Sequence, residues 1–453
     1  MAVPARLEPG PRAGADDSSV LVATTTLVGL LAVSAAFVFL QRPELVILAF
    51  AAAVVVFVCA VRVDFALLLL VATVPLEGAI QLGSGSDITI SKLAGGLCFA
   101  SFFLFALATR RRLLFDGSHA LILVLLGLAL LSTLQATEVP QALSTTVRYA
   151  SFVALYIVVS QFVGDHRLQR RLVWVLSAAS TVAGLLAIEN FLSGAELQAA
   201  LPYTSTNDTA FVLATTLPLT FWLLRGGLGT RVAAVAMIGV MSASIVLSFS
   251  RGALVGLAAA AVVHVLTQRR HVLVLLLGVL AALVATFAFV RTNPAQIETG
   301  FEAKQRVADE NVASRLEAWK GAVELIEEKP LLGVGPNNYR EHFYEATGRP
   351  PGTDNPLVVH NAYLDVGAEL GVIAMLLFLA YVGVVLWRSN VATRRGNGPP
   401  GYATAVRSAL IVAAVASLFL SEQYYAPLWL LGGLATALWW ENRHPATLAS
   451  AEQ

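Results

Sequence analysis

Long runs of apolar residues alternate with short polar connections along most of the chain. Several of these runs exceed the roughly 18–20 residues that an α-helix needs to cross the core of a bilayer. Lipid offers no hydrogen-bond partner, so the backbone groups of such a run must be satisfied within the run itself, as they are in a helix. The pattern therefore predicts an all-α integral membrane protein.

The apolar runs predict about fourteen transmembrane helices, within a range of twelve to fourteen. About eleven belong to an N-terminal bundle over residues 20–291, and about three lie within residues 361–441. Residues 1–19 are expected to form a disordered cytoplasmic tail and not a signal peptide, and 442–453 a second cytoplasmic tail. The expected spans are 20–40, 44–61, 64–82, 90–109, 118–135, 144–163, 170–192, 208–225, 231–248, 251–267, 271–291, 361–387, 403–420 and 426–440.

The distribution of Lys and Arg predicts which side of the membrane each connection faces, because short cytoplasmic loops carry an excess of these residues. Connections after even-numbered spans are basic, as at Arg110–Arg112, Arg167–Arg171 and Arg388–Arg395, and the others are nearly free of such residues except for Arg42 and Arg251. This alternation predicts that both termini are cytoplasmic and that residues 292–360 form one large extracytoplasmic loop.

One helix is expected inside this loop. Ser314 followed by Glu317 has the spacing of a capping box, and Lys329-Pro330 would end the helix. Between them, apolar residues recur at helical spacing: Leu316, Trp319, Val323 and Ile326. We therefore predict an amphipathic surface helix over about 314–328, with its apolar face on the bundle or the membrane interface.

Composition adds little about partners. Of the 453 residues, 57% are hydrophobic and 13% charged, against about 25% charged in soluble domains, which agrees with a membrane protein. A net charge of +1 does not indicate a nucleic-acid partner. Cys59 and Cys98 both lie in apolar runs, so neither a disulfide nor a zinc framework is expected.

Two arginines are candidate anion ligands on the outer side. Arg251 follows Ser250 at the start of an expected span, and Arg315 follows Ser314 in the first turn of the loop helix. Helix N-termini attract anions through unpaired N–H groups, and a guanidinium adds a fork of donors that matches a phosphate. The alternative for each arginine is that it extends to the membrane surface or pairs with a carboxylate.

His360 is the candidate general base, at the point where the loop re-enters the membrane. An imidazole titrates near neutral pH and can accept a proton from a hydroxyl nucleophile, and the alternative is that an interfacial His caps the next helix. Tyr363, Asp365 and Glu369 follow on that helix as possible supporting residues, since ionisable groups in a span are often functional.

Arg148 lies about one turn inside the outer end of its span, on the side that is poor in positive charge. It could bind an anionic ligand or extend to a lipid phosphate. The sequence contains no phosphate loop, dinucleotide fingerprint, metal-spaced His/Cys cluster or nucleophile elbow. We therefore expect no cofactor and no metal, with arginines stabilising any developing negative charge.

Three stretches together resemble the O-antigen ligase/polymerase family of bacterial envelope membrane proteins. They are Ser248–Ala253, Ser314–Gly335 and His360–Gly371, and their order, spacing and expected sidedness all agree with the family. The expected span count is the one departure, because a typical ligase has twelve spans; polymerases vary more, so fourteen leans towards polymerisation.

The resemblance implies a membrane-embedded C-type glycosyltransferase that is metal-independent and inverting. Such enzymes take a glycan from an undecaprenyl-pyrophosphate carrier at the outer face of the bacterial cytoplasmic membrane. They pass it to a hydroxyl of lipid A–core, another glycan or a protein. By the same resemblance, Arg251 and Arg315 bind the donor pyrophosphate and His360 activates the acceptor.

Two other classes of protein remain open from the sequence. One is a transporter or flippase for a lipid-linked oligosaccharide, although no internal repeat is evident and the polar clusters lie at the outer rim. The other is a scaffold in an envelope-assembly complex, in which Arg251, Arg315 and His360 would be individually dispensable. Convergence of these three residues on one outward-facing site would favour the enzyme.

Overall fold

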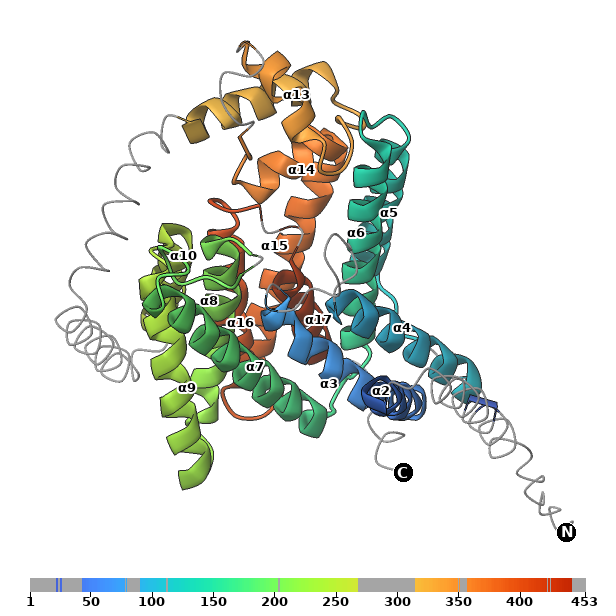
Figure 1. Ribbon diagram of the computed structural model, residues 1–453, viewed down its shortest axis with the longest axis vertical. Helices are drawn as coiled ribbons and strands as arrows, with labels where there is room; N and C mark the ends of the chain where they lie inside the picture. Colours follow the sequence, from blue (N-terminus) through green and yellow to red (C-terminus); the bar gives the residue numbers. More distant parts are fainter. Residues whose placement is uncertain are drawn as a thin grey trace, which may run out of the picture. The chain divides into compact units, whose positions relative to one another are not determined.

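All regular secondary structure in the described part of the computed structural model is helical (Figure 1). The model describes residues 22, 25–26, 43–77, 79, 90–110, 113–202, 204–267, 314–348, 350, 357–421, 423 and 425–441. The expected all-α fold is confirmed over these residues.

The helices follow the predicted runs closely. Residues 314–328 are helical, as expected from the capping box at Ser314. The remaining helices are α2 Pro43–Val61, α3 Val63–Thr73, η1 Val74–Leu76, α4 Ile90–Thr109, α5 Gly117–Thr133, α6 Val139–Ser160, α7 His166–Leu192, α8 Thr206–Leu223, α9 Leu228–Leu247, α10 Arg251–Thr267, α13 Tyr339–Thr347, α14 Ala362–Leu370, α15 Val372–Arg395, α16 Tyr402–Ala416 and α17 Ala426–Trp440.

Five of these helices, α4, α6, α7, α9 and α15, are long and apolar enough to cross a membrane. Six further apolar helices are shorter, including α5, α10, α16 and α17. Almost all of the predicted span at 20–40 and the whole of that at 271–291 lie outside the described residues. The protein has the helices of a membrane protein, and the count of fourteen spans stays a prediction.

One predicted span differs from the structure. Residues 361–387 were expected to form a single span, but the chain breaks at Gly371, whose φ is +90°. The Val372 N–H there donates to the Pro330 carbonyl oxygen at 2.8 Å. A Cβ on Gly371 would lie 2.5 Å from the Leu331 carbonyl carbon, so only glycine fits. The short helix α14 therefore precedes the spanning helix α15.

The chain divides into two units. The first comprises residues 1–67 and 97–113, and the second 68–96 and 114–453, so the boundary falls inside α3 and α4. Within the first unit, the Cys59 and Cys98 side chains are buried, and the Ser101 hydroxyl donates to the Cys59 carbonyl oxygen at 2.5 Å.

The second unit is built around α17, in which every residue from Ala426 to Trp440 is buried. This helix packs against α6, α15 and α16, and α16 packs in turn against α8 and α10. Gly433 permits the close approach to α6, because a Cβ there would lie 2.8 Å from the Val159 Cβ. Small residues take this role in membrane bundles, where helices gain stability from close packing.

A buried polar cluster joins four elements of the second unit. Arg388 of α15 forms an ion pair with Asp116, the N-cap of α5, at 2.6 Å, and its side chain is 5% exposed. The same guanidinium donates to three hydroxyl groups on α5, α6 and α17: Ser118, Tyr156 and Thr436. Arg388 was counted from the sequence as a loop charge that sets sidedness, but its guanidinium is buried in this cluster.

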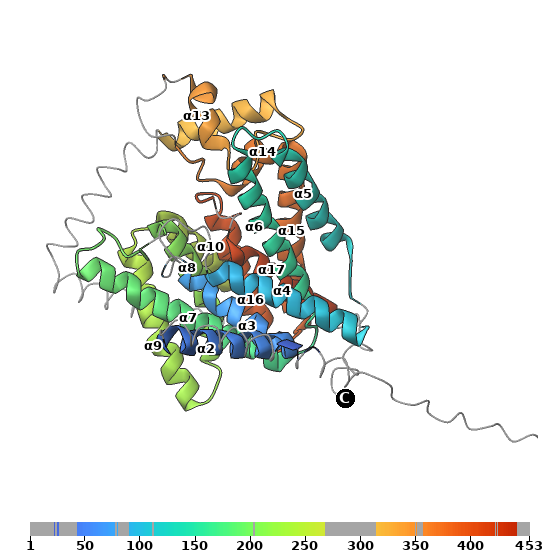
Figure 2. The ribbon, with the colours of Figure 1, turned by 45° about the vertical axis from the view of Figure 1, so that its right-hand side comes forward.

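The segment that follows the 314–328 helix is held against the ends of α5 and α14. Ser132 of α5 donates to the carbonyl oxygens of Leu332 and Glu369, and the Gly335 N–H donates to the Glu369 carbonyl oxygen at 2.9 Å. A Cβ on Gly335 would lie 2.9 Å from the Ala136 Cα. In Figures 1 and 2, α13 lies beside α14 at the end of the second unit where α5 ends and α6 begins.

Candidate functional site

Arg251 is the first residue of α10, after a tight turn from α9. Phe249 in this turn has a φ of +51°, an unusual conformation for a residue with a side chain. The buried Ser250 hydroxyl donates to the Asn207 side-chain oxygen at 2.9 Å, which ties the turn to the first turn of α8. The turn and the first residue of α10 are thereby fixed, while the Arg251 side chain is exposed.

Arg315 belongs to the helical segment 314–328 and is half-buried. Its Nε is buried without a hydrogen-bond partner. Burial, and secondly the positive charge of Arg251, lower the pKa of Arg315. Arg251 therefore lies near enough for its charge to act on Arg315.

Neither arginine has a carboxylate partner at ion-pair distance among the described residues. Two like charges held near each other raise the energy of the folded state, and the cost grows with burial. An anion bound between Arg251 and Arg315 would remove this repulsion and supply the missing acceptor for the Arg315 Nε. An anion-binding role for the pair stays a prediction.

His360 is half-buried and has a φ of +51°. On its N-terminal side, the Trp319 indole N–H donates to the Val359 carbonyl oxygen at 2.9 Å. On its C-terminal side, the Ala362 N–H donates to the carbonyl oxygens of Ser417 and Leu420 at 2.9 and 3.0 Å. Backbone strain of this kind persists only where the surroundings fix it, and it concentrates at functional sites.

The residue after His360, Asn361, caps the helix that follows. Its side-chain oxygen accepts the N–H groups of Tyr363 and Leu364 at 3.1 and 3.2 Å, so Asn361 is the N-cap of α14. Sequence reasoning allowed that an interfacial His could cap this helix, but the cap is the next residue. The His360 imidazole is therefore not needed for capping.

The three principal predicted residues are connected through two shared neighbours. Leu420 accepts the Ala362 N–H, and its Cγ would lie 3.3 Å from a Cβ on Gly252, the residue after Arg251. Trp319 lies one helical turn after Arg315 and contacts the residue before His360. The 314–328 helix, the start of α10 and the start of α14 are therefore linked in the second unit through contacts at Val359, Ala362 and Leu420.

The four supporting candidates each have protein partners. Arg148 donates to Glu77 at 2.9 Å, and the Tyr363 hydroxyl donates to the Ala414 carbonyl oxygen at 2.8 Å. Asp365 is buried and accepts from the Gln423 amide at 2.7 Å. The Glu369 carboxylate is buried and accepts backbone N–H groups at the start of α13, from Asn337 and Tyr339. These contacts shape the surroundings of the site, and a part in the reaction stays a prediction.

Sequence reasoning missed several polar residues around the site. Asp208 of α8 accepts a hydrogen bond from the Tyr425 hydroxyl, so the first turn of α8 also joins the segment between α16 and α17. Ser205 with Asp208 forms a capping box that the sequence would have revealed. No sequence signal connects residues as distant as Glu77 and Arg148, or Trp319 and Val359.

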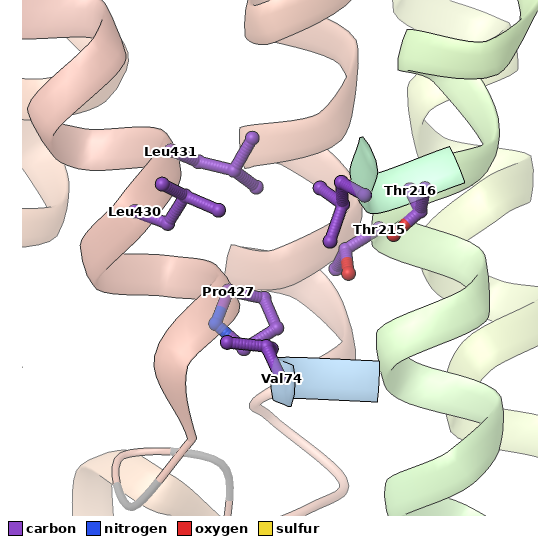
Figure 3. Close-up of a pocket in the computed structure, with 7 residues that line it drawn as sticks. Val74, Thr215, Thr216, Pro427, Leu430 and Leu431 are labelled. Carbon is purple, nitrogen blue, oxygen red and sulfur yellow. The ribbon is translucent and has the colours of Figure 1, made fainter. Parts of the chain in front are cut away.

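A small cavity lies inside the second unit between η1, α7, α8 and α17 (Figure 3). Val74, Pro427 and Leu431 line it together with Thr216, whose hydroxyl donates to the Val212 carbonyl oxygen of its own helix. Its volume of about 10 Å³ is near the lower limit for one water molecule. The cavity is too small for a sugar ring and is separate from the arginine pair.

Groups of three or more His, Cys, Asp or Glu side chains that could hold a metal ion do not occur within the residues that the structure describes. The expectation of a metal-independent protein stays a prediction.

The described part of the chain combines helices long and apolar enough to cross a bilayer with two arginines that lack a described carboxylate partner and a histidine with a positive φ. Residues 233–379 match the family model described as O-antigen ligase, and all three motif stretches lie within this range. The match confirms the resemblance to the O-antigen ligase/polymerase family over these residues. A search of curated proteins found no match to the chain. The family implies, in general terms, glycan transfer in polysaccharide assembly.

Proposed function

We propose that this protein transfers a glycan from an undecaprenyl-pyrophosphate carrier to an acceptor hydroxyl at the outer face of the bacterial cytoplasmic membrane. The reaction is that of an O-antigen or exopolysaccharide ligase or polymerase, and it needs no metal. The observation that supports the proposal is the arginine pair: the charge of Arg251 acts on Arg315, and neither has a carboxylate partner among the described residues.

In the proposed reaction, the acceptor oxygen attacks the anomeric carbon of the donor sugar from the face opposite the pyrophosphate. The bond between that carbon and the pyrophosphate oxygen breaks, so the anomeric configuration inverts. His360 takes the acceptor proton, and the leaving pyrophosphate gains negative charge. Donors aimed at developing charge are usually the largest single contribution to catalysis, and Arg251 and Arg315 would supply them here.

There are two alternative functions: a lipid-linked oligosaccharide transporter or flippase, and an envelope-assembly scaffold. A transporter would need the arginines for binding but would not need a base. A scaffold would need none of the three side chains of Arg251, Arg315 and His360 for its activity. The strained backbone at His360, next to the anion site, favours an enzyme over both.

The proposed donor site predicts the effect of removing one guanidinium. Arg315→Ala should abolish most transfer in purified, reconstituted protein and weaken donor binding, because the leaving pyrophosphate loses a charged partner. Arg251→Lys should also be poorly tolerated if the contact is bidentate, since an ammonium group cannot form the fork. Lys320→Ala, which removes an exposed cation from the same helix, is the matched control and should retain transfer.

The measurement is glycan transfer together with donor binding, after the helical content and detergent-solubilised stability of each variant have been checked. Near-normal transfer by both arginine variants would rule out the donor site. If the wild-type protein binds the donor but shows no detectable transfer, and the arginine variants lose donor binding, the result would favour a transporter.

The proposal places the site, and α13 with it, outside the cytoplasmic membrane. A cysteine introduced by Glu345→Cys in α13, where the side chain is 75% exposed, should react with a membrane-impermeant maleimide in intact right-side-out vesicles. Arg395→Cys at the far end of α15 should react only after permeabilisation. The native Cys59 and Cys98 are buried and should give little background. The reverse labelling pattern would invert the topology and exclude an extracytoplasmic site.

A further inference from the structure

Trp319 has an additional contact that its position on an apolar helix face does not explain. Its indole N–H donates to the Val359 carbonyl oxygen at 2.9 Å, across 40 residues of sequence. The ring also packs against a buried apolar cluster that includes Ala322, Tyr339 and Phe343. The ring therefore packs among apolar residues while its N–H group holds the backbone beside His360.

The Val359 carbonyl belongs to the peptide group that joins Val359 to His360. Holding this carbonyl restricts the rotation of that peptide plane, and with it the φ of His360. Because His360 has a left-handed backbone conformation, φ +51°, its relaxed conformation would point the imidazole elsewhere. The opposite end of the segment is held by the Ala362 N–H on Ser417 and Leu420.

We propose that Trp319 is a positioning residue that aims the His360 imidazole at the acceptor. The inference rests on the proposed function, in which His360 is the base. Arg315 lies four residues before Trp319, so the two side chains share one face of the 314–328 helix. A single helix would then carry Arg315, which binds the donor, and also Trp319, which orients the base. This arrangement would fix the distance between the bound donor and the His360 imidazole.

The simpler alternative is that Trp319 only fills space. Trp319→Phe separates the two, because phenylalanine keeps an aromatic ring in the cluster but has no N–H group. We expect Trp319→Phe to lower turnover at saturating donor by about 10- to 100-fold, the usual effect of a small misplacement of a catalytic group. Donor affinity should change little, since Arg251 and Arg315 are retained.

Trp222→Phe is the matched control. The Trp222 indole N–H also donates to a backbone carbonyl oxygen, that of Pro400, at 3.1 Å. Trp222→Phe removes the same atoms, but no residue of the proposed site is involved. Turnover should therefore stay within about twofold of wild type, which corresponds to a change in activation free energy of at most a few tenths of a kcal/mol. If Trp319→Phe does not fold, replacement of Trp319 by benzothienylalanine, in which sulfur stands for the N–H, gives the same test with the ring shape unchanged.

A packing role for Trp319 and a positioning role differ in whether the effect of Trp319→Phe on turnover depends on His360. In a His360→Ala background, Trp319→Phe should cause no further loss of turnover, because there is no base left to position. An equal loss in both backgrounds would overturn the inference and leave Trp319 as a packing residue, and so would wild-type turnover for both Trp319 variants. Normal turnover of His360→Ala alone would instead overturn the base assignment, and with it the proposed mechanism.

Discussion

His360→Ala should lower turnover by about two to four orders of magnitude, the range for losing a general base. Donor binding should survive, because the proposed phosphate contacts belong to Arg251 and Arg315. Fold and stability should also be retained, since the α14 cap is provided by the neighbouring Asn361 and the imidazole is half-buried. The effect should therefore fall on the chemical step.

The deciding measurement is donor affinity alongside turnover in the purified variant. His342→Ala removes a histidine of α13 that contacts Thr137 and Glu345, and should leave turnover unchanged. If donor affinity collapses in His360→Ala while turnover at saturating donor stays normal, His360 is a binding residue and the base mechanism is wrong.

Arg388→Ala should destabilise the protein by about 3–5 kcal/mol, because it leaves the partly buried Asp116 carboxylate and three hydroxyl groups without their cation. Arg394→Ala, on the same helix but exposed, should be nearly neutral. The expected result is a lower midpoint of thermal or denaturant unfolding in detergent for Arg388→Ala alone.

The combined variant Arg388→Met with Asp116→Leu tests the cause. Removing both charges leaves no unpaired ion, so part of the lost stability should return. No recovery in the double variant, or an unchanged midpoint for Arg388→Ala, would mean that the ion pair contributes little and that other contacts hold α5 to α15.

Local patterns predicted the helices well because they depend on neighbouring residues. The Lys329-Pro330 ending gave the end of the helical segment 314–328, and the serine before Arg251 marked the start of α10, whereas the predicted cap at Ser314 stays a prediction. The three principal candidate residues were proposed in the same way, from their positions at expected helix starts. The proposed anion site needed only this placement and the charge of the side chains.

Features that depend on tertiary contacts were beyond the sequence. The break at Gly371 arises from close packing on Pro330 and Leu331, and apolar periodicity continues through it. Trp319 has the spacing of a packing residue, so its hydrogen bond to Val359 gave no signal. Arg388 looked like a loop charge because nothing nearby in the sequence indicates that its counter-ion is Asp116.

The separation of 272 positions in the sequence between Asp116 and Arg388 matters during biosynthesis. Ribosomes deliver α5 and α6 to the insertion machinery long before α15 and α17 exist, so the Asp116 carboxylate waits without its cation. A nascent chain that stops after α10 keeps this polar cluster incomplete, a state that membrane proteases can recognise. Only when α15 enters the membrane do the early and late helices become one unit, and truncated products should accordingly be short-lived.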